Sequence, residues 1–216
     1  MMFEQLPYGR ARKAERLVAA LFAVVLMTAC GSVPKTHYYS VTMPAAAPAA
    51  DSPSGGVLDV ARFQAASVLR DDRILYYQTP TELNYYQYHR WSAEPAVLMA
   101  ELVSRRVKAS GAFSDVRQIP HSTPGDFQLR GRVLNFEELD YEPGGHVRMA
   151  LELDLVRNSD HKIVWSGTER SERAIAGKGV GAVVDALNAS AAEVVDKLLP
   201  QLLAGAKRDT AAQGAK

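Results

Sequence analysis

The sequence of 216 residues has little of several features that point to common functional classes. It contains 25 Lys and Arg against 24 Asp and Glu, for a formal net charge of +1. It therefore lacks the basic excess of a dedicated nucleic-acid-binding protein. The single cysteine excludes a disulfide framework and a thiolate metal cluster. The apolar run at residues 17–28 is too short to cross a bilayer, which needs a helix of about 20 residues.

Patterns of catalytic residues are also missing. The histidines are scattered and form no HxxxH or HExxH pair, and no GxSxG motif is present. We expect the adjacent carboxylates of Asp71 and Asp72, and of Glu137 and Glu138, to lie on wet loops or on opposite faces of a strand. The sequence therefore predicts no enzyme activity, no catalytic residue, no metal and no cofactor.

One segment, Gly177–Ala182, matches the loose dinucleotide-binding pattern GxGxxA. A true fingerprint needs a second strand with an acidic residue about 20 residues further on. Only one helix is predicted after this segment, so we interpret it as a glycine-rich turn between a strand and that helix.

The first 29 residues have the layout of a secretory signal peptide. Four basic residues precede the apolar run, and small residues follow it. The segment Leu26-Met-Thr-Ala-Cys30 resembles a bacterial lipobox, with Met27 where leucine is usual. This resemblance implies cleavage before Cys30 and lipidation of Cys30. Several acyl chains on one residue would anchor the protein stably, since each buried CH₂ contributes roughly 0.8 kcal/mol. Gly31 and Ser32 follow, and the absence of aspartate there favours delivery to the outer membrane.

The remaining pattern predicts an α+β fold. Short strands are expected at 35–42, 57–60 and 73–78, and an extended aromatic-rich segment at 83–91. Longer strands are expected at 127–140, 146–156 and 162–175. In the first of these, the apolar phase shifts between Val133 and Leu134, which indicates a bulge. In the second, the apolar residues alternate. In the third, Ile163 and Trp165 are expected to share a face.

Two helices with apolar stripes are predicted, at about 92–110 and 180–203. The first has Ser92 as a candidate N-cap, or Glu94 because Pro95 disfavours helical geometry at the preceding residue. Gly111 is expected to end it. Pro200 should kink or loosen the last turn of the second helix. We expect an antiparallel or mixed sheet with both helices packed on one face.

The aromatic block is the most unusual feature of the sequence. Six aromatic residues fall between positions 76 and 91: Tyr76, Tyr77, Tyr85, Tyr86, Tyr88 and Trp91. Alternation in an extended strand places Leu83, Tyr85 and Trp91 on one face, inward, where Trp91 can pack against Ala96 or Val97 at the start of the helix. The other face then presents Tyr86, Tyr88 and Arg90 as a candidate partner interface. We regard Trp91, Pro95 and Gly111 as structural.

The same region carries a family resemblance. The run from Arg73-Ile-Leu-Tyr through Leu83-Asn-Tyr-Tyr-Gln-Tyr-His-Arg-Trp-Ser-Ala-Glu-Pro95 to Ser110-Gly-Ala-Phe113 resembles the ABC-type transport auxiliary lipoproteins, the PqiC-like family. The resemblance spans about residues 30–204 and is motif-specific over 73–116. It implies a non-catalytic auxiliary role beside an MCE-domain protein in lipid transport between the two membranes of diderm bacteria. The implied location is the periplasmic face of the outer membrane.

These interpretations divide the chain into four parts. Residues 1–29 form the signal peptide, 30–56 a lipidated N-terminus with a Pro/Ala/Ser/Gly linker, 57–204 one α+β domain, and 205–216 a disordered tail. The expected partners are an MCE-domain protein, the outer membrane and possible further copies of the chain, with no nucleic acid. Two alternatives stay open, namely a lipid- or peptidoglycan-binding envelope module and an outer-membrane assembly factor.

Overall fold

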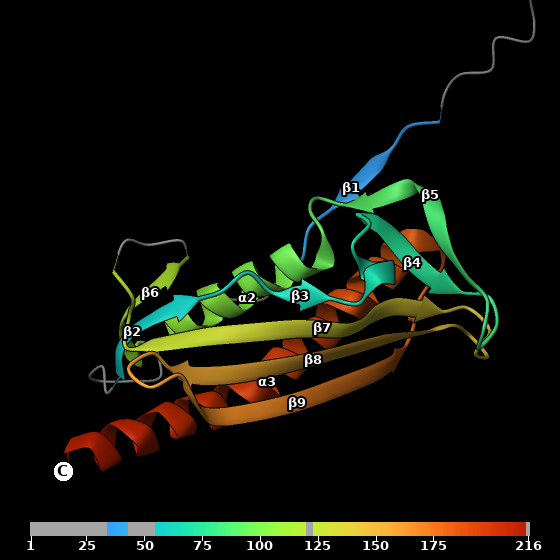
Figure 1. Cartoon of the computed structure of the whole chain (residues 1–216). Coiled ribbons are helices and arrows are strands. Elements are labelled where there is room, and N and C mark those ends of the chain that lie inside the picture. Colours follow the sequence, from blue (N-terminus) through green and yellow to red (C-terminus); the bar gives the residue numbers. More distant parts are fainter. Residues whose placement is uncertain (1–33, 43–54, 120–122, 215–216) are drawn as a thin grey trace, which may run out of the picture. The chain divides into compact units, whose positions relative to one another are not determined.

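The computed structural model describes residues 34–42, 55–119 and 123–214 (Figure 1). The predicted signal peptide, Cys30 and most of the predicted linker lie outside the described residues. Every element below belongs to the compact unit that begins at Thr36. In chain order the elements are β1 (His37–Tyr39), β2 (Gly55–Val60), β3 (Gln64–Ala65), the 3₁₀ turn η1 (Ser67–Leu69), β4 (Arg73–Tyr77), β5 (Leu83–Trp91), α2 (Pro95–Ala109), β6 (Phe113–Gln118), β7 (Phe127–Leu139), β8 (His146–Arg157), β9 (Lys162–Ala174) and α3 (Gly179–Gly214).

The described strands form one mixed nine-stranded sheet, and α2 and α3 pack on one of its faces (Figure 1). Strand β7 is central to the sheet. On one side it pairs in parallel with β2, β3 and β4, and on the other it pairs antiparallel with β8. β5 joins β4, and β1 joins β5 in parallel. The predicted α+β class, with a mixed sheet and two main helices, is confirmed.

The predicted bulge in β7 is present. Its register with β8 shifts between Val133 and Asn135, so Val133 pairs with Leu151 while Asn135 pairs with Ala150. The extra residue restores the apolar phase after Leu134, and Phe136 is fully buried. One irregularity therefore keeps a thirteen-residue strand in contact with the same core along its length.

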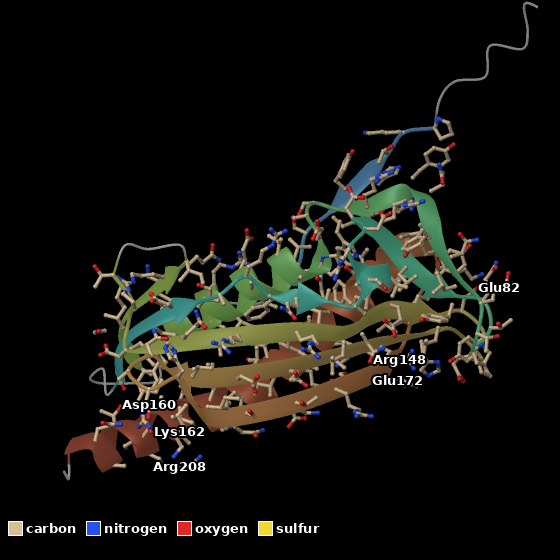
Figure 2. The ribbon with its side chains drawn as sticks, in the orientation of Figure 1. Glu82, Arg148, Asp160, Lys162, Glu172 and Arg208 are labelled. Carbon is tan, nitrogen blue, oxygen red and sulfur yellow. The ribbon has the colours of Figure 1, made fainter. Side chains whose placement is uncertain are left out.

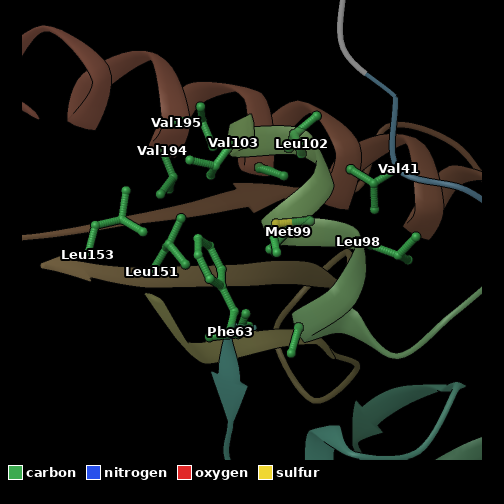
Figure 3. Close-up of a cluster of buried hydrophobic side chains, with 14 of the residues drawn as sticks. Val41, Phe63, Leu98, Met99, Leu102, Val103, Leu151, Leu153, Val194 and Val195 are labelled. Carbon is green, nitrogen blue, oxygen red and sulfur yellow. The ribbon is translucent and has the colours of Figure 1, made fainter. Parts of the chain in front are cut away.

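The core lies between the helices and the sheet face that β8 presents to them. The alternating apolar residues predicted for β8 are all buried: Val147, Met149, Leu151, Leu153 and Leu155. Figure 3 shows Leu151 and Leu153 beside Met99 and Val103 of α2 and Val194 of α3. Both predicted helical stripes therefore meet the predicted strand face.

Helix α2 begins with Glu94 as its N-cap and Pro95 in its first turn, so the second of the two predicted caps is the one observed. Gly111 follows the helix with a φ of 66°, a left-handed conformation that glycine adopts without steric cost. On the exposed side, Arg105 and Glu101 form an i,i+4 ion pair at 3.7 Å.

Helix α3 is longer than predicted. It continues through Pro200 to Gly214, where a disordered tail was expected from residue 205. Two contacts explain the extension. Gly205 leaves room for Trp165 of β9, because a Cβ at this glycine would lie 2.7 Å from the Cβ of the tryptophan. Asp209 forms an ion pair with Arg157 of β8 at 2.8 Å.

Three further differences concern strands. β3 and β6 were not predicted, and in β6 the two buried apolar residues, Phe113 and Val116, are three positions apart and do not alternate. Ile163 and Trp165 do not share a face, because the register of β8 and β9 shifts beside them. Trp165 lies against α3, whereas Ile163 is 52% exposed.

Candidate functional site

The aromatic block lies at one end of the sheet, on β4 and β5, with β1 at its edge (Figure 1). The pairing of β4 with β5 is irregular. Leu75 pairs with Tyr85, but Arg73 pairs with Arg90, so β5 contains extra residues between the two regular parts. Simple alternation therefore does not hold from Leu83 to Trp91, and the predicted faces of this strand need correction residue by residue.

Trp91 is buried, with 1% of its surface exposed. Its ring lies 4.9 Å from that of Phe136 in β7, measured between centroids, at a tilt of 36°. Its backbone N–H donates to the carbonyl oxygen of Asp72 at 2.6 Å. The side chain thus fills the core where β5 turns toward α2, in keeping with a structural role.

Tyr86 does not point freely outward, contrary to the prediction. Its hydroxyl donates to Glu138 Oε2 at 2.7 Å, and its ring lies 4.8 Å from that of Tyr76. Burial, followed by the neighbouring Glu138 carboxylate, raises the pKa of Tyr86. Burial likewise raises the pKa of Glu138, although the bond from Tyr86 partly offsets this. Tyr86 is therefore the hydrogen-bond donor to a buried carboxyl group.

Arg90 is also engaged within the fold. Its guanidinium forms an ion pair with Asp72 in the loop before β4, and about a third of each side chain remains exposed. This partly exposed ion pair leaves the guanidinium of Arg90 accessible to a partner and holds the Arg90 side chain in one position. Of the three predicted interface residues, Tyr88 is the most exposed, with 38% of its surface accessible, whereas Tyr86 and Arg90 are partly buried.

The structure adds one residue to this surface. Tyr38 of β1 pairs with Arg90 of β5, so the two side chains lie on the same face of the strand pair. Tyr88 lies two positions before Arg90 in β5 and is also exposed. Tyr38 is 66% exposed. We refer to Tyr38, Tyr88 and Arg90 as the tyrosine patch. No sequence pattern points to Tyr38, because its pairing residue Arg90 is 52 positions away.

The opposite face of β1 and β5 holds a stack of rings. His37 and His89 stack with centroids 5.1 Å apart, and Tyr39 hydrogen-bonds His89 Nδ1 through its hydroxyl at 2.9 Å. Burial, and then the neighbouring His37, lower the pKa of His89. The lowered pKa favours the neutral form of His89. The stacking of His89 on His37 and its hydrogen bond with Tyr39 hold the three-residue strand β1 on the sheet.

The acidic pair Glu137 and Glu138 lies on β7, and both residues are buried. Glu137 accepts hydrogen bonds from Arg148 Nε at 2.8 Å, Asn135 Nδ2 at 2.7 Å and the Phe136 backbone N–H at 2.6 Å. Burial raises its pKa, and these three donors oppose the shift. As neighbours in a strand, the two carboxyl groups face opposite sides, as predicted, and cannot act on one substrate together.

The described residues contain no group of three or more His, Cys, Asp or Glu side chains arranged to hold a metal ion. The segment Gly177–Ala182 covers the end of the turn from β9 and the first residues of α3, with Gly177 at φ 126° and Gly179 at φ 77°. No strand follows α3 in the described part of the chain. A surface pocket of about 580 Å³ lies near the C-terminal end of α3, lined among others by Phe127, Arg157 and Asp209.

Solved structures with the same fold are known. Protein XCC0632 of Xanthomonas campestris is 24% identical and superposes with a TM-score of 0.71, covering 81% of this chain and 99% of that one. An uncharacterized protein, 13% identical, has a TM-score of 0.62 and covers 78% and 99%. No curated protein matches the sequence significantly.

The family is identified by sequence. The model of the ABC-type transport auxiliary lipoprotein component matches residues 39–198, and the chain belongs to this family. The predicted resemblance is thereby confirmed. None of the helices in the described ranges is both long and apolar enough to pass through a membrane. As a member of a lipoprotein family, the protein is a membrane-anchored component of the cell envelope that serves an ABC transporter.

Proposed function

We propose that this protein is the auxiliary subunit of an MCE-type ABC lipid transport system, anchored by Cys30 to the periplasmic face of the outer membrane. In this role it supports lipid traffic between the membranes without catalysing a reaction. The tyrosine patch docks the MCE-domain partner. Family membership supports the transport role, and the exposure of Tyr38 and Tyr88 beside a fixed arginine supports the choice of surface.

The chemistry of the patch suits protein recognition. Tyrosine and arginine are enriched at the energetic centres of interfaces, since each combines a large apolar surface with a polar tip. Arg90 is held by Asp72, so little side-chain entropy is lost when a partner binds. Tyr86 lies in the same strand but is not part of the patch. The hydrogen bond from its hydroxyl to Glu138 fixes the backbone near Tyr88.

The position of the patch along the chain also supports the proposal. Cys30 precedes His37 of β1 by seven residues, a length of at most about 25 Å when fully extended. A lipid on Cys30 would therefore hold the tyrosine-rich end of the sheet near the membrane surface. A partner that reaches the membrane from the periplasm would meet this end.

The anchor is tested with Cys30→Ala in the full-length chain. We expect an uncleaved precursor that stays in the inner membrane, measured by membrane fractionation and by mass. Wild-type protein run beside it gives the mature size, and the Met27→Leu variant, which keeps Cys30 and restores the usual lipobox residue, should be processed normally. A Cys30→Ala protein of mature size in the outer membrane would overturn the anchor.

The docking surface is tested by crosslinked pull-down of the lipidated protein from native membranes. Tyr38→Ala, Tyr88→Ala and Arg90→Ala should each preserve the melting temperature and reduce recovery of the MCE-domain protein several-fold. Ile163→Ala removes an equally exposed apolar side chain from the far end of β9 and should leave recovery unchanged. Unchanged recovery with all three patch variants, or recovery of lipid or peptidoglycan in place of an MCE protein, would reject this assignment.

A further inference from the structure

Strand β9 forms a long open edge of the sheet. It pairs with β8 along its thirteen residues, and no other described strand pairs with it (Figure 1). Such an edge presents unpaired backbone N–H and C=O groups to any strand that can align with it. The edge strands at the other side of the sheet are much shorter, with three residues in β1 and six in β6.

The charges on β9 are arranged symmetrically. The segment from 169 to 173 reads Glu-Arg-Ser-Glu-Arg. If a second copy pairs antiparallel about Ser171, Glu169 lies opposite Arg173 of the second copy, and Arg170 lies opposite Glu172. The two-fold axis repeats both pairs, so four oppositely charged pairs form at once. Opposite charges placed directly across two strands stabilise the pairing.

The same charges disfavour other alignments. A shift of one residue in one direction brings Glu169 opposite Glu172, and a shift in the other direction brings Arg170 opposite Arg173. An in-register parallel pairing places each charge beside its own copy. A shift of two residues places Arg170 or Glu172 opposite its own copy. Like charges directly across two strands are destabilising, so the register about Ser171 is favoured over those within two residues of it.

The side chains needed for this pairing are available. Arg170 and Glu172 are exposed, and neither forms an ion pair within the described structure. Glu172 lies across from Arg148 of β8, as Figure 2 shows, but that arginine is bonded to Glu137. On the other face, Arg173 pairs with Glu193 of α3 at 2.9 Å, and Glu169 accepts a hydrogen bond from Gln201 at 3.2 Å. The pair between Arg173 and Glu169 therefore contributes less to the dimer.

The flanking residues leave room for a second strand. In the register centred on Ser171, Thr168 lies opposite Ala174 of the second copy, so the ends of the seven-residue overlap carry small side chains. Two-fold pairing in one sheet also keeps the helices of both copies on the same face, and the charged outer faces remain in solvent. The arrangement therefore buries no unpaired charge.

We propose that β9 is a self-association edge, through which two copies of the protein join their sheets antiparallel about Ser171. This surface is separate from the tyrosine patch and does not depend on the identity of the transport partner. Anchoring in one membrane would raise the effective concentration of the two copies, so a modest affinity is sufficient.

The test uses the full-length protein extracted from membranes in a mild detergent and studied by sedimentation and by chemical crosslinking. Wild-type protein should form dimers. Arg170→Glu and Glu172→Arg each place like charges opposite one another twice, and should weaken dimerisation about tenfold or more. The double variant Arg170→Glu/Glu172→Arg exchanges the two charges and should restore the wild-type dimer.

Arg132→Glu is the matched control, because it reverses an exposed charge on β7, away from the edge. It should leave the dimer unchanged, and all variants should retain the wild-type circular dichroism. A wild-type monomer at every concentration, single reversals without effect, or a double variant that does not recover would each overturn the proposal. An assembly larger than a dimer that is insensitive to these reversals would also overturn it.

Discussion

The two ends of the sheet are held together in different ways. Along β7 and β8 the strands alternate between apolar and polar residues for most of their length, and the apolar side chains form a dry core with α2 and α3. At the tyrosine-rich end, aromatic hydroxyls bind buried or half-buried acceptors: Tyr86 binds Glu138, Tyr85 binds the carbonyl of Val68, and Tyr39 binds His89.

This difference has physical consequences. The stability of a dry core depends on how completely its side chains fill the available volume. Such a core tolerates exchanges between apolar residues of similar size and is destabilised by cavities. A buried polar network depends on single atoms and on protonation, because a lost donor leaves a desolvated acceptor behind. At the tyrosine-rich end, the free energy of unfolding should therefore change when a single hydroxyl is removed or when the pH changes. Along the long strands, it should fall when buried methylene groups are removed.

The largest effect is expected where the two regions meet, at Trp91. Trp91→Ala removes a fully buried ring that packs on Phe136 and should lower the free energy of unfolding by about 3–5 kcal/mol. Urea denaturation of the domain measures this. Tyr88→Ala, three residues earlier in the same strand and exposed, is the control. A loss below about 1 kcal/mol would mean that Trp91 lies outside the cooperative core.

Leu151→Ala tests the dry core itself. Leu151 is completely buried on the strand face that both helices contact, so its truncation should cost about 2–5 kcal/mol by the same measurement. Ile163→Ala, at a half-exposed position on the neighbouring strand, should cost less than about 0.5 kcal/mol. Equal costs at the two sites would show that burial on this face does not govern stability.

Tyr86→Phe tests the polar end with the loss of one oxygen. Glu138 then has no donor from Tyr86, and the cost should be about 1–3 kcal/mol at neutral pH. Because burial raises the pKa of folded Glu138, acidification favours the native state through this group, and the cost should shrink near pH 4–5. Tyr88→Phe, with an exposed hydroxyl, should change nothing. A cost independent of pH would indicate lost packing in place of an unpaired carboxylate.

The smallest effect is expected at Glu193, which joins α3 to β9. Bonds from Lys197 and Ser171 lower its pKa from 4.5 to about 2. A lowered pKa stabilises the folded state above the ordinary value, and this contribution disappears as the pH falls from 4.5 toward 2. Since a third of the side chain is exposed, Glu193→Gln should cost less than about 1 kcal/mol at pH 7. The difference from wild type should vanish near pH 2 in urea titrations, and a constant difference would contradict this.

The contrast between the two ends also explains which features could be predicted from the sequence. The alternation of β8, the bulge of β7 and the stripes of α2 and α3 follow from local patterns, because a long element that buries one face must repeat it. These predictions are confirmed. The last turns of α3 carry no such stripe, since they depend on a distant contact between Trp165 and Gly205.

The candidate site was predicted only in part for a related reason. The aromatic segment was placed correctly as the strand Leu83–Trp91, but the extra residues in its pairing with β4 change the faces and take Tyr86 toward Glu138. Tyr38 lies in a strand of three residues whose partner is far along the chain. Neither an irregular register nor a parallel partner leaves a periodic signal in one sequence.

The central position of β7 has a consequence for the order in which the chain can fold. Strands β2, β3 and β4 are all made before β7, yet each pairs with it in parallel, across sequence separations of about 60 residues or more. Contacts between such distant segments form slowly. Until residues 127–139 are available, the first half of the sheet has no strand to organise it. The sheet is therefore expected to assemble late, which suits the export that the proposed lipid anchor at Cys30 requires.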